Sequence, residues 1–420
     1  MVSASPRIVL AQSQLELAQK QLEVTASWLQ TSLSSGYTQN WSSLEVSGET
    51  TTDNEGDIDP ISLNAALNVV PYGPWHERVQ QSRWAVERAR LALRDERANV
   101  IIELTAQFQN SLRAEENVAL EAQKLELAEL NLAAAQTRLE AGAATPSDLL
   151  QLELALQQAQ EDALSAERER AQALAQLSNL LGQAVSDVSG TLPDFSDDLT
   201  FDDENVSTRS DVVTAQLGVA EAEQNANAIR RENLPSGSVS AGYSVGGEDA
   251  TLQLGAGYSL NGANAYQPSV NLSYDPDTGL RDLPAGTSQS FSVGIDVVIP
   301  FDIALPDALE AARLSVEGAR LRAEQALTLA RLEAETLAAN LSGARATGDL
   351  AEQILDQRRN SLDITQQRFD LGLISMLELA EAKVNVLEAE LSLHRAEDAV
   401  RLAAMRYAAA LALNPLEVLQ

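Results

Sequence analysis

Apolar residues follow two different periods along this chain, and the change of period predicts where helices and strands lie. In 75–141 and 306–371, apolar residues recur at alternating steps of three and four, the spacing of long helices packed side by side. In 61–70 and 236–299 they alternate with Ser, Asn and Gly, which favours strands with one apolar face. The chain therefore combines long paired helices with short stretches of sheet.

The chain also repeats itself. Val86-Glu87 matches Val316-Glu317 at an offset of 230 residues (316 − 86 = 230), and Ala89-Arg90-Leu91 matches Ala319-Arg320-Leu321. The register continues without a gap through Gly142 and Gly372 to Leu149 and Leu379. A loop would have drifted in length, so both copies occupy equivalent places in one architecture.

Each copy predicts the same order of elements. The first repeat spans 1–182, with a helix at 5–30, strands within 31–70, a long helix at 75–141 and a return helix at 146–181. The second spans 208–420, with a helix at 209–232, strands within 236–299, a long helix at 306–371 and a return helix at 375–413. Residues 183–207, rich in Asp, Ser, Gly and Pro, are interpreted as an irregular side layer, with a disordered linker as the alternative.

Helix lengths constrain how these elements pack. A helix of about 67 residues is about 100 Å long, whereas a return helix of about 36 residues covers only about 55 Å. The preceding helix of each repeat is close to the missing length. We therefore expect it to stack end to end on the return helix, so that the molecule becomes a unit of four rods.

The residue pattern of the strands favours a location in a membrane. Alternation of apolar and small polar residues suits a wall with lipid on one face and water on the other, although a water-soluble sandwich alternates in the same way. Aromatic residues favour the membrane, because most, including Trp28 and Tyr258, lie within or beside the strands, as an interfacial girdle requires. Four main strands cannot close a barrel alone. We predict a mainly α fold in which duplicated coiled-coil hairpins form an α-barrel and three chains share a twelve-stranded β-barrel.

The strand region of the second repeat is longer than that of the first. Interruptions at 246–249 and 276–286 flank a turn at 261–264, which predicts pairing of 238–245 with 291–299 and of 252–260 with 270–274. A span needs only about 9 to 11 residues per strand, so the second pair is expected to project beyond the membrane as an outer rung.

Composition excludes several other classes. The net charge of −32 argues against nucleic acid and anionic headgroups as partners, and the absence of cysteine excludes thiol chemistry and disulfides. No run of 18 apolar residues predicts a transmembrane helix. Residues 1–6 lack the features of a secretion signal, so an exported protein would start here on its mature or an engineered chain. No catalytic, cofactor or metal motif is present, and we predict no enzyme.

The tips of the two hairpins resemble the TolC-like outer-membrane efflux proteins. The pattern Arg138-x-x-x-Gly142-x-x-Thr145-x-x-Asp148-Leu149 returns as Arg368-x-x-x-Gly372-x-x-Ser375-x-x-Glu378-Leu379, and the junctions Val69-Val70-Pro71-Tyr72 and Val298-Ile299-Pro300-Phe301 also look like that family's. The resemblance implies a homotrimeric channel-tunnel with a β-barrel in the outer membrane and an α-barrel in the periplasm, which docks a periplasmic adaptor and an inner-membrane pump. Low lysine content, the missing signal and the long second strand region depart from the family.

The resemblance also implies roles for the tips. Glu378 and Glu381 match an acidic ring that narrows the periplasmic entrance, whereas the first repeat has Asp148 and Gln151 there. The residues expected to meet the adaptor are Arg138, Gly142, Ala143, Thr145, Asp148, Arg368, Gly372, Leu373, Ile374 and Ser375.

Each role has a simpler alternative. Thr145 with Asp148, and Ser375 with Glu378, also fit helix-capping boxes, and the glycines fit helix C-caps. Glu381 can be a solvated helix residue, and the apolar tip residues can form a small cluster that closes the coiled coil. A trimeric structural or adhesive surface protein without transport is the alternative function.

Overall fold

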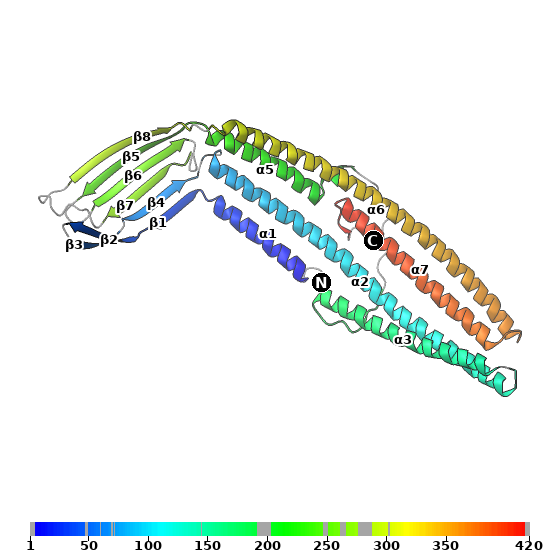
Figure 1. Cartoon of the computed structure of the whole chain (residues 1–420). Helices are drawn as coiled ribbons and strands as arrows, with labels where there is room; N and C mark the ends of the chain where they lie inside the picture. Colours follow the sequence, from blue (N-terminus) through cyan, green and yellow to red (C-terminus); the bar gives the residue numbers. More distant parts are fainter. Residues whose placement is uncertain are drawn as a thin grey trace. The chain divides into compact units, whose positions relative to one another are not determined.

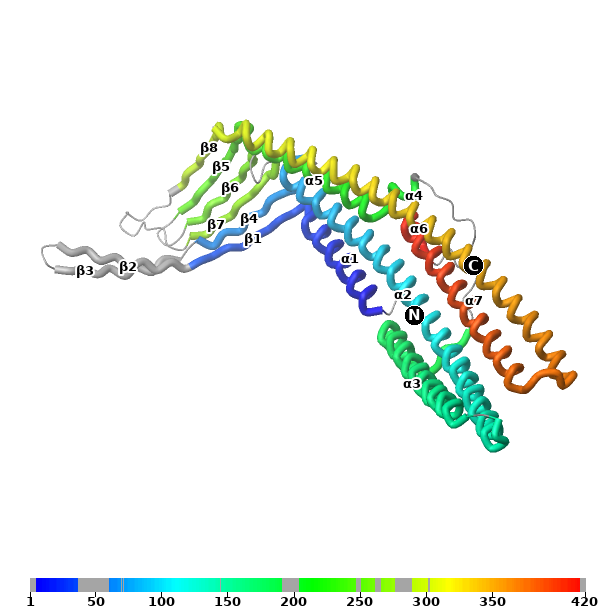
Figure 2. Tube along the Cα trace, turned by 45° about the vertical axis from the view of Figure 1, so that its right-hand side comes forward, coloured from blue at the N-terminus to red at the C-terminus, as the bar shows by residue number. Residues whose placement is uncertain are grey.

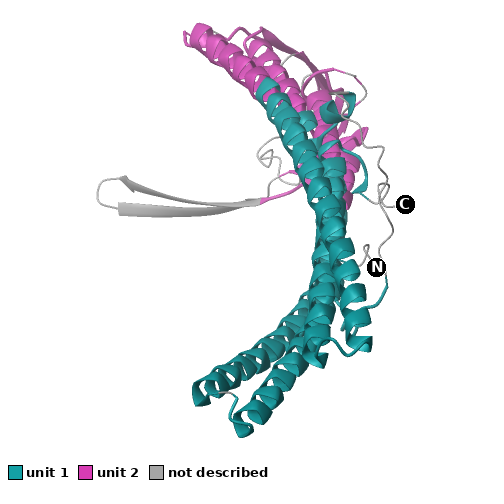
Figure 3. Ribbon diagram, turned by 90° about the vertical axis from the view of Figure 1, so that its right-hand side faces the viewer, with its two compact units in different colours: residues 1–14, 89–214, 324–420 teal, residues 15–88, 215–323 magenta. Residues whose placement is uncertain are grey.

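The computed structural model describes residues 5–46, 49–58, 60–68, 70, 72–143, 145–190, 203–246, 251–260, 266–275, 288–300 and 303–415. The chain divides into two compact units (Figure 3). One, called here the helical unit, comprises 1–14, 89–214 and 324–420. The other, called the sheet unit, comprises 15–88 and 215–323.

Seven helices are described. Helix α1 is Pro6–Thr25, α2 is Pro74–Glu140, α3 is Pro146–Leu181, α4 is Asp203–Ser207, α5 is Ser210–Glu232, α6 is Leu305–Asp370 and α7 is Met376–Ala410 (Figures 1 and 2). Local signals set these bounds, because proline stands in the first turn of several helices, where its missing N–H costs nothing, and glycine follows α2, α3 and α6. The mainly α fold predicted from the sequence is confirmed.

The core of the helical unit is a series of apolar contacts along the paired helices. Leu120 of α2 packs with Val384 and Leu391 of α7. On its other side, α7 buries Val386 and Ala389 against Leu355 of α6. The short helix α4 joins a third cluster through Val206, which is fully buried with α5, α6 and the end of α7. Residues 203–207 are therefore a packed helical turn, whereas 191–202 lie outside the described residues.

The strands form two sheets. Strands β1 (Leu29–Ser34), β4 (Ile61–Leu67), β7 (Ser269–Asp275), β6 (Thr251–Leu260), β5 (Ser236–Gly246) and β8 (Ser288–Val298) lie side by side in that order, with every neighbouring pair antiparallel (Figures 1 and 2). Strands β2 (Tyr37–Val46) and β3 (Glu49–Ile58) pair separately. All eight belong to the sheet unit.

Three predictions about the first repeat need correction. The helix expected to reach residue 30 ends at Thr25, because Leu29 pairs with Leu67 as the start of β1. Residues 33–46, expected as one of the strands within 31–70, span two strands in different sheets, β1 and β2. Strand β3 was not predicted, since its sequence ETTTDNEGDI has no apolar alternation and it forms by pairing with β2.

In the second repeat both predicted strand pairings are confirmed, but the prediction that the second pair forms an outer rung is wrong. Strand β5 pairs with β8, and β6 pairs with β7. However, β6 also pairs along its length with β5, and β7 pairs with β4, so the second pair lies beside its neighbours. Six strands per chain thus form the main sheet, rather than the four on which the twelve-stranded barrel rested. Of the interruption predicted at 246–249, Gly246 is the last residue of β5, and 247–249 lie outside the described residues, as do 276–286 and the turn at 261–264.

Candidate functional surfaces: a two-faced sheet and two hairpin tips

One face of the six-stranded sheet is apolar across every strand. Residues directly opposite each other in antiparallel strands project to the same face, so the pairing register joins them into rows. One such row is aliphatic and aromatic throughout, and its members are Leu33, Leu63, Leu272, Leu254, Tyr243 and Phe291. All six side chains are exposed in the single chain, most strongly at the edge strands, where Leu33 is 73% and Phe291 72% exposed. Among the residues that the structure describes, none in the sheet unit covers this surface, called here the apolar face.

The opposite face consists of small polar residues. Its corresponding row is Ser34, Ser62, Ser273, Gln253, Ser244 and Ser290. Ser244 and Ser290 are hydrogen-bonded through their hydroxyls at 2.7 Å, and Asn271 donates to Asn64. Glycine is used where strands crowd, since a Cβ built at Gly294 would lie 2.7 Å from Ser240 Oγ. This surface, called here the polar face, suits contact with water.

Aromatic side chains gather where the strands meet the helices of the sheet unit. Trp28 is exposed beside the start of β1, and Tyr72 packs edge-to-face on Tyr266 with ring centroids 4.7 Å apart. Trp75 donates its indole N–H to the Thr25 carbonyl at 2.9 Å, which ties the start of α2 to the end of α1. Amphipathic rings at the end of an apolar surface are typical of a membrane interface.

In the helical unit, the two hairpin tips have the same backbone geometry. In the first, Gly142 at φ +73° follows α2, and the Ala143 and Gly142 amides donate to the carbonyls of Arg138 and Leu139 at 2.8 and 2.9 Å. In the second, the Leu373 and Gly372 amides donate to Arg368 and Phe369 at 2.9 and 2.8 Å. This is the Schellman motif, which requires the left-handed conformation that glycine adopts without strain.

The predicted capping boxes are also present. The Thr145 amide donates to Asp148 Oδ2 at 2.9 Å, and the Asp148 amide donates to Thr145 Oγ1 at 3.3 Å. Ser375 and Glu378 form the same pair of hydrogen bonds at 2.8 and 3.3 Å. Hydrogen bonds from the Thr145 backbone and then its side chain lower the pKa of Asp148. Capping therefore explains Asp148 and Glu378.

Capping leaves the second acid of the second tip unexplained. Glu381 is exposed three residues after Glu378, which places both on one face of α7. Around it, Leu371, Leu373 and Met376 expose large apolar side chains, whereas Ile374 is half-buried. Arg138, Ala143 and Arg368 are exposed as well, and Ala144 lies outside the described residues. The second tip therefore combines two carboxylates with an apolar end.

A line of ion pairs joins the two hairpins within the helical unit. Arg113 of α2 lies 2.8 Å from Asp398 of α7, and Arg401 pairs with the same carboxylate at 3.0 Å. Burial raises the pKa of Asp398, although both arginines oppose that rise. Nearer the tips, Lys124 of α2 pairs with Glu388 of α7 at 2.8 Å. Charge therefore adds specificity to the contact between α2 and α7.

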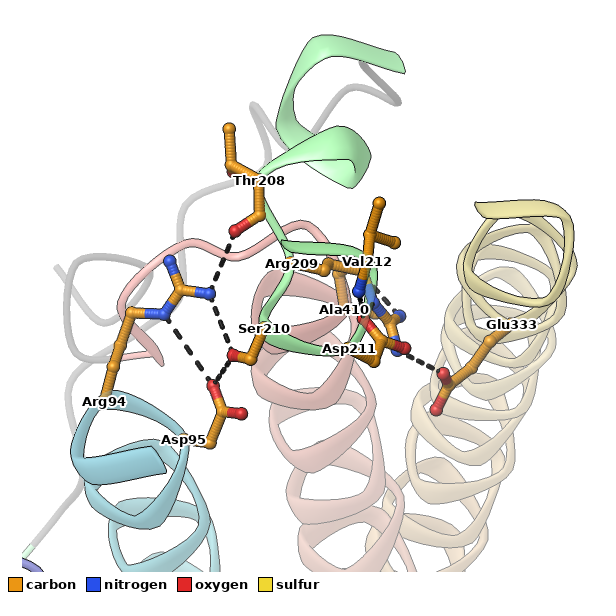
Figure 4. Close-up of polar contacts among 9 residues, drawn as sticks. All are labelled: Arg94, Asp95, Thr208, Arg209, Ser210, Asp211, Val212, Glu333 and Ala410. Carbon is orange, nitrogen blue, oxygen red and sulfur yellow. Dashed lines mark hydrogen bonds and ion pairs between the residues drawn. The ribbon is translucent and has the colours of Figure 1, made fainter. Parts of the chain in front are cut away.

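A polar cluster fixes the start of α5 in the same unit (Figure 4). Arg209 bridges to Asp211 at 2.9 Å and to Glu333 of α6 at 2.6 Å, and it donates to the Ala410 carbonyl at the end of α7. On the other side, Arg94 of α2 donates to the Thr208 carbonyl and to Ser210 Oγ at 3.1 and 3.0 Å. Sequence reasoning missed both polar clusters, because their contacts between different elements join residues more than 100 positions apart and no local pattern marks them.

A sheet with one apolar and one polar face, carried by a chain of duplicated coiled-coil hairpins, defines a class of channel-forming membrane protein. Over 2–183 and 204–413 the chain matches the family model described as outer membrane efflux protein. This chain belongs to that family. None of the helices in the described part of the chain has the length and apolar character needed to cross a bilayer.

Solved structures share the fold. The Campylobacter jejuni outer membrane channel CmeC is 15% identical, with a TM-score of 0.67 and coverage of 98% of this chain and 83% of that one. VceC from Vibrio cholerae is 17% identical, with a TM-score of 0.65 and coverage of 98% and 93%. The open-state MtrE channel of Neisseria gonorrhoeae is 16% identical, with a TM-score of 0.67 and coverage of 100% and 88%. No curated protein sequence matches the chain.

Proposed function

We propose that this protein is a homotrimeric outer-membrane channel-tunnel that serves as the exit duct for efflux or for a secretion process of the type I kind. The observation that carries the proposal is the two-faced sheet. An apolar face across all six strands is best covered by the hydrocarbon of a bilayer, because an uncovered apolar patch of this extent is unfavourable in water. The polar face then lines a water-filled path.

Closure requires more than one copy. Strands β1 and β8 end the sheet on either side, and their outer N–H and C=O groups have no partner within it. Unpaired backbone groups cost several kcal/mol each in hydrocarbon, so the edges must pair with another chain. Three copies arranged around an axis satisfy both edges of each sheet.

The helices are assigned to the periplasm, where the tips would dock a periplasmic adaptor and, through it, an inner-membrane pump. Exposed apolar side chains at the second tip support a contact site, because they have no core to enter. Arg138, Arg368 and the glycine turns complete the proposed contact. Glu378 and Glu381 would form an acidic ring at the entrance, which favours cations.

The test is purification in detergent followed by mass measurement and planar-bilayer recording. We expect a species three times the mass of the chain that forms conducting pores. A water-soluble monomer would refute the proposal. A stable membrane-bound trimer that forms no pore, even when both tip carboxylates are neutralised, would favour the structural or adhesive alternative.

A further inference from the structure

The hairpin β6–β7 is part of the main sheet, whereas β2–β3, the hairpin at the equivalent place in the first repeat, pairs separately. Strands β1 and β4 from the first repeat and β5 and β8 from the second would make a four-stranded sheet by themselves. The hairpin β6–β7 is inserted between them, because β7 pairs with β4 and β6 pairs with β5. No direct pairing joins β4 to β5 in the described sheet.

This hairpin has the same two faces as its neighbours, at the same level. Leu63 of β4 lies opposite Leu272 of β7, and Leu254 of β6 lies opposite Tyr243 of β5, all on the apolar face. On the polar face, Ser62 is opposite Ser273 and Gln253 is opposite Ser244. A surface that lipid covers on β4 and β5 therefore continues unbroken across β6 and β7.

The insertion also preserves the conditions for closure. All five pairings are antiparallel, so β1 and β8 at the two edges run in opposite directions. Strand β8 of one copy can thus pair antiparallel with β1 of the next. Adding two strands keeps that relation, whereas adding one would break it.

We propose that the β6–β7 hairpin is part of the barrel wall, so that the trimer on which the proposed function rests has eighteen strands (3 × 6 = 18) rather than twelve. The hairpin then sets the width of the exit and the size of cargo that can leave. With strands about 4.8 Å apart and tilted by about 40°, twelve strands give a backbone radius of about 12 Å and eighteen give about 18 Å.

The lining implies selection by size. Asp275 and Asp296 are the only charged residues in the six strands. Apart from Ala66 and Val298, the remaining polar face is Ser, Asn, Gln, Thr and Gly. Small side chains take about 4 Å from the radius, which leaves a water-filled radius of about 14 Å for eighteen strands and about 8 Å for twelve. The exit would therefore accept bulky hydrated cargo with little preference for charge.

Cysteine pairs test the strand order directly, because the native chain has no cysteine. Ser62→Cys with Ser273→Cys should form a disulfide in the membrane-embedded trimer, since these residues are directly opposed. Ser62→Cys with Ser244→Cys should not, since two strands separate them, a distance of about 14 Å. Ser244→Cys with Ser290→Cys is the positive control, because both strand orders keep that pair together.

Peptide mass spectrometry after oxidation reads the result. Linkage of Ser62→Cys to Ser273→Cys alone supports the proposal. Linkage of Ser62→Cys to Ser244→Cys, or failure of both pairs while the control links, overturns it and indicates that β6–β7 has folded out of the wall. Failure of the chain to form a membrane trimer would instead count against the proposed function.

The exit width is measured by polymer exclusion. A polyethylene glycol of hydrodynamic radius about 11 Å lies between the two expected water-filled radii. Added only on the barrel side of a planar bilayer, it should enter and lower the conductance of the native trimer. The matched variant replaces 247–287 with Asn-Gly, a two-residue turn that can join the opposed Gly246 and Ser288, and should exclude the same polymer. Exclusion by the native trimer would overturn the proposal while leaving the channel function in place.

Discussion

The most informative perturbation of the entrance is Glu381→Gln, because the structure separates this residue from the helix cap. The carboxylate of Glu378 accepts the Ser375 amide at 2.8 Å, so any change at that position alters the cap as well as the charge. Glu381 lies one turn further along α7, outside the capping box. Replacing it with Gln removes one charge per chain and keeps the side-chain volume.

The expected magnitude follows from Coulomb's law. Three carboxylates at about 8 Å from an axis, at a dielectric constant near that of water, stabilise a monovalent cation by about 1.5 kcal/mol, or about tenfold in occupancy. Glu381→Gln should therefore lower the occupancy of the entrance by a monovalent cation by about tenfold, and with it the preference for cations over anions. The change should be largest at about 0.1 M salt and small at about 1 M, where the Debye length falls to about 3 Å. Thermal unfolding should be almost unchanged.

Reversal potentials in a salt gradient measure the selectivity, and the first repeat provides a matched control. Asp148→Asn alters a capping box whose two hydrogen bonds, at 2.9 and 3.3 Å, match those of the second tip, but Gln151 stands where the second acid would be. Asp148→Asn should leave the reversal potential close to the native value. The reasoning is refuted if both variants shift it equally, or if Glu381→Gln does not shift it.

Three further outcomes are expected. Gly372→Ala should destabilise the helical unit by about 1 kcal/mol because φ is +71° at that residue. Gly343→Ala within α6 should instead stabilise the unit by about 0.5 to 1 kcal/mol. Thermal midpoints that shift in opposite directions would confirm both. The Thr145 amide should lose its protection against hydrogen exchange as the pH falls through the lowered pKa of Asp148, and hydrogen-exchange measurements at that amide check this. The reason is that a carboxylate with a depressed pKa stabilises the folded tip while it is ionised and no longer does so once it is protonated. Asp398→Ala should cost about 2 to 4 kcal/mol in chemical unfolding because it removes the largely buried carboxylate that Arg113 and Arg401 share, although Arg113 keeps its pair with Glu116. Glu390→Ala, which breaks an exposed pair, should cost less than about 1 kcal/mol.

The helices could be predicted closely because their signals are local. The structure has α2 at Pro74–Glu140 and α3 at Pro146–Leu181, against predictions of 75–141 and 146–181. Heptad spacing marks the helix, and glycine and the capping pair mark its ends within a few residues. The hairpin tips share this property, so their geometry was also predictable, whereas the roles of their side chains toward a gate or an adaptor stay predictions.

The sheet was harder, because alternation reveals the face of a residue and not its neighbour. The period-two pattern correctly predicted strands with one apolar face within 236–299, yet β6–β7 was expected beyond β5 and β8 as an outer rung and lies beside β5 instead. Only pairing with β4, about 200 residues earlier, decides between the two positions. The contact of Arg113 with Asp398 has the same character, since it joins residues 285 positions apart (398 − 113 = 285). Non-local contacts of this kind leave no mark in a short window of sequence.

Comparison of the two repeats separates structural residues from functional ones. A residue type found at equivalent positions of both copies is explained by the fold that both share, as the matching capping boxes at Asp148 and Glu378 are. A feature present in one copy only has no such explanation, because the other copy folds without it. Glu381 is one such feature, and the incorporation of the β6–β7 hairpin into the main sheet is another, because its counterpart β2–β3 pairs separately. Both occur in the second repeat. In a threefold duct, each chain contributes its second repeat once. A change confined to that repeat therefore adds three Glu381 carboxylates and six strands to the trimer, while the framework shared by both repeats stays intact.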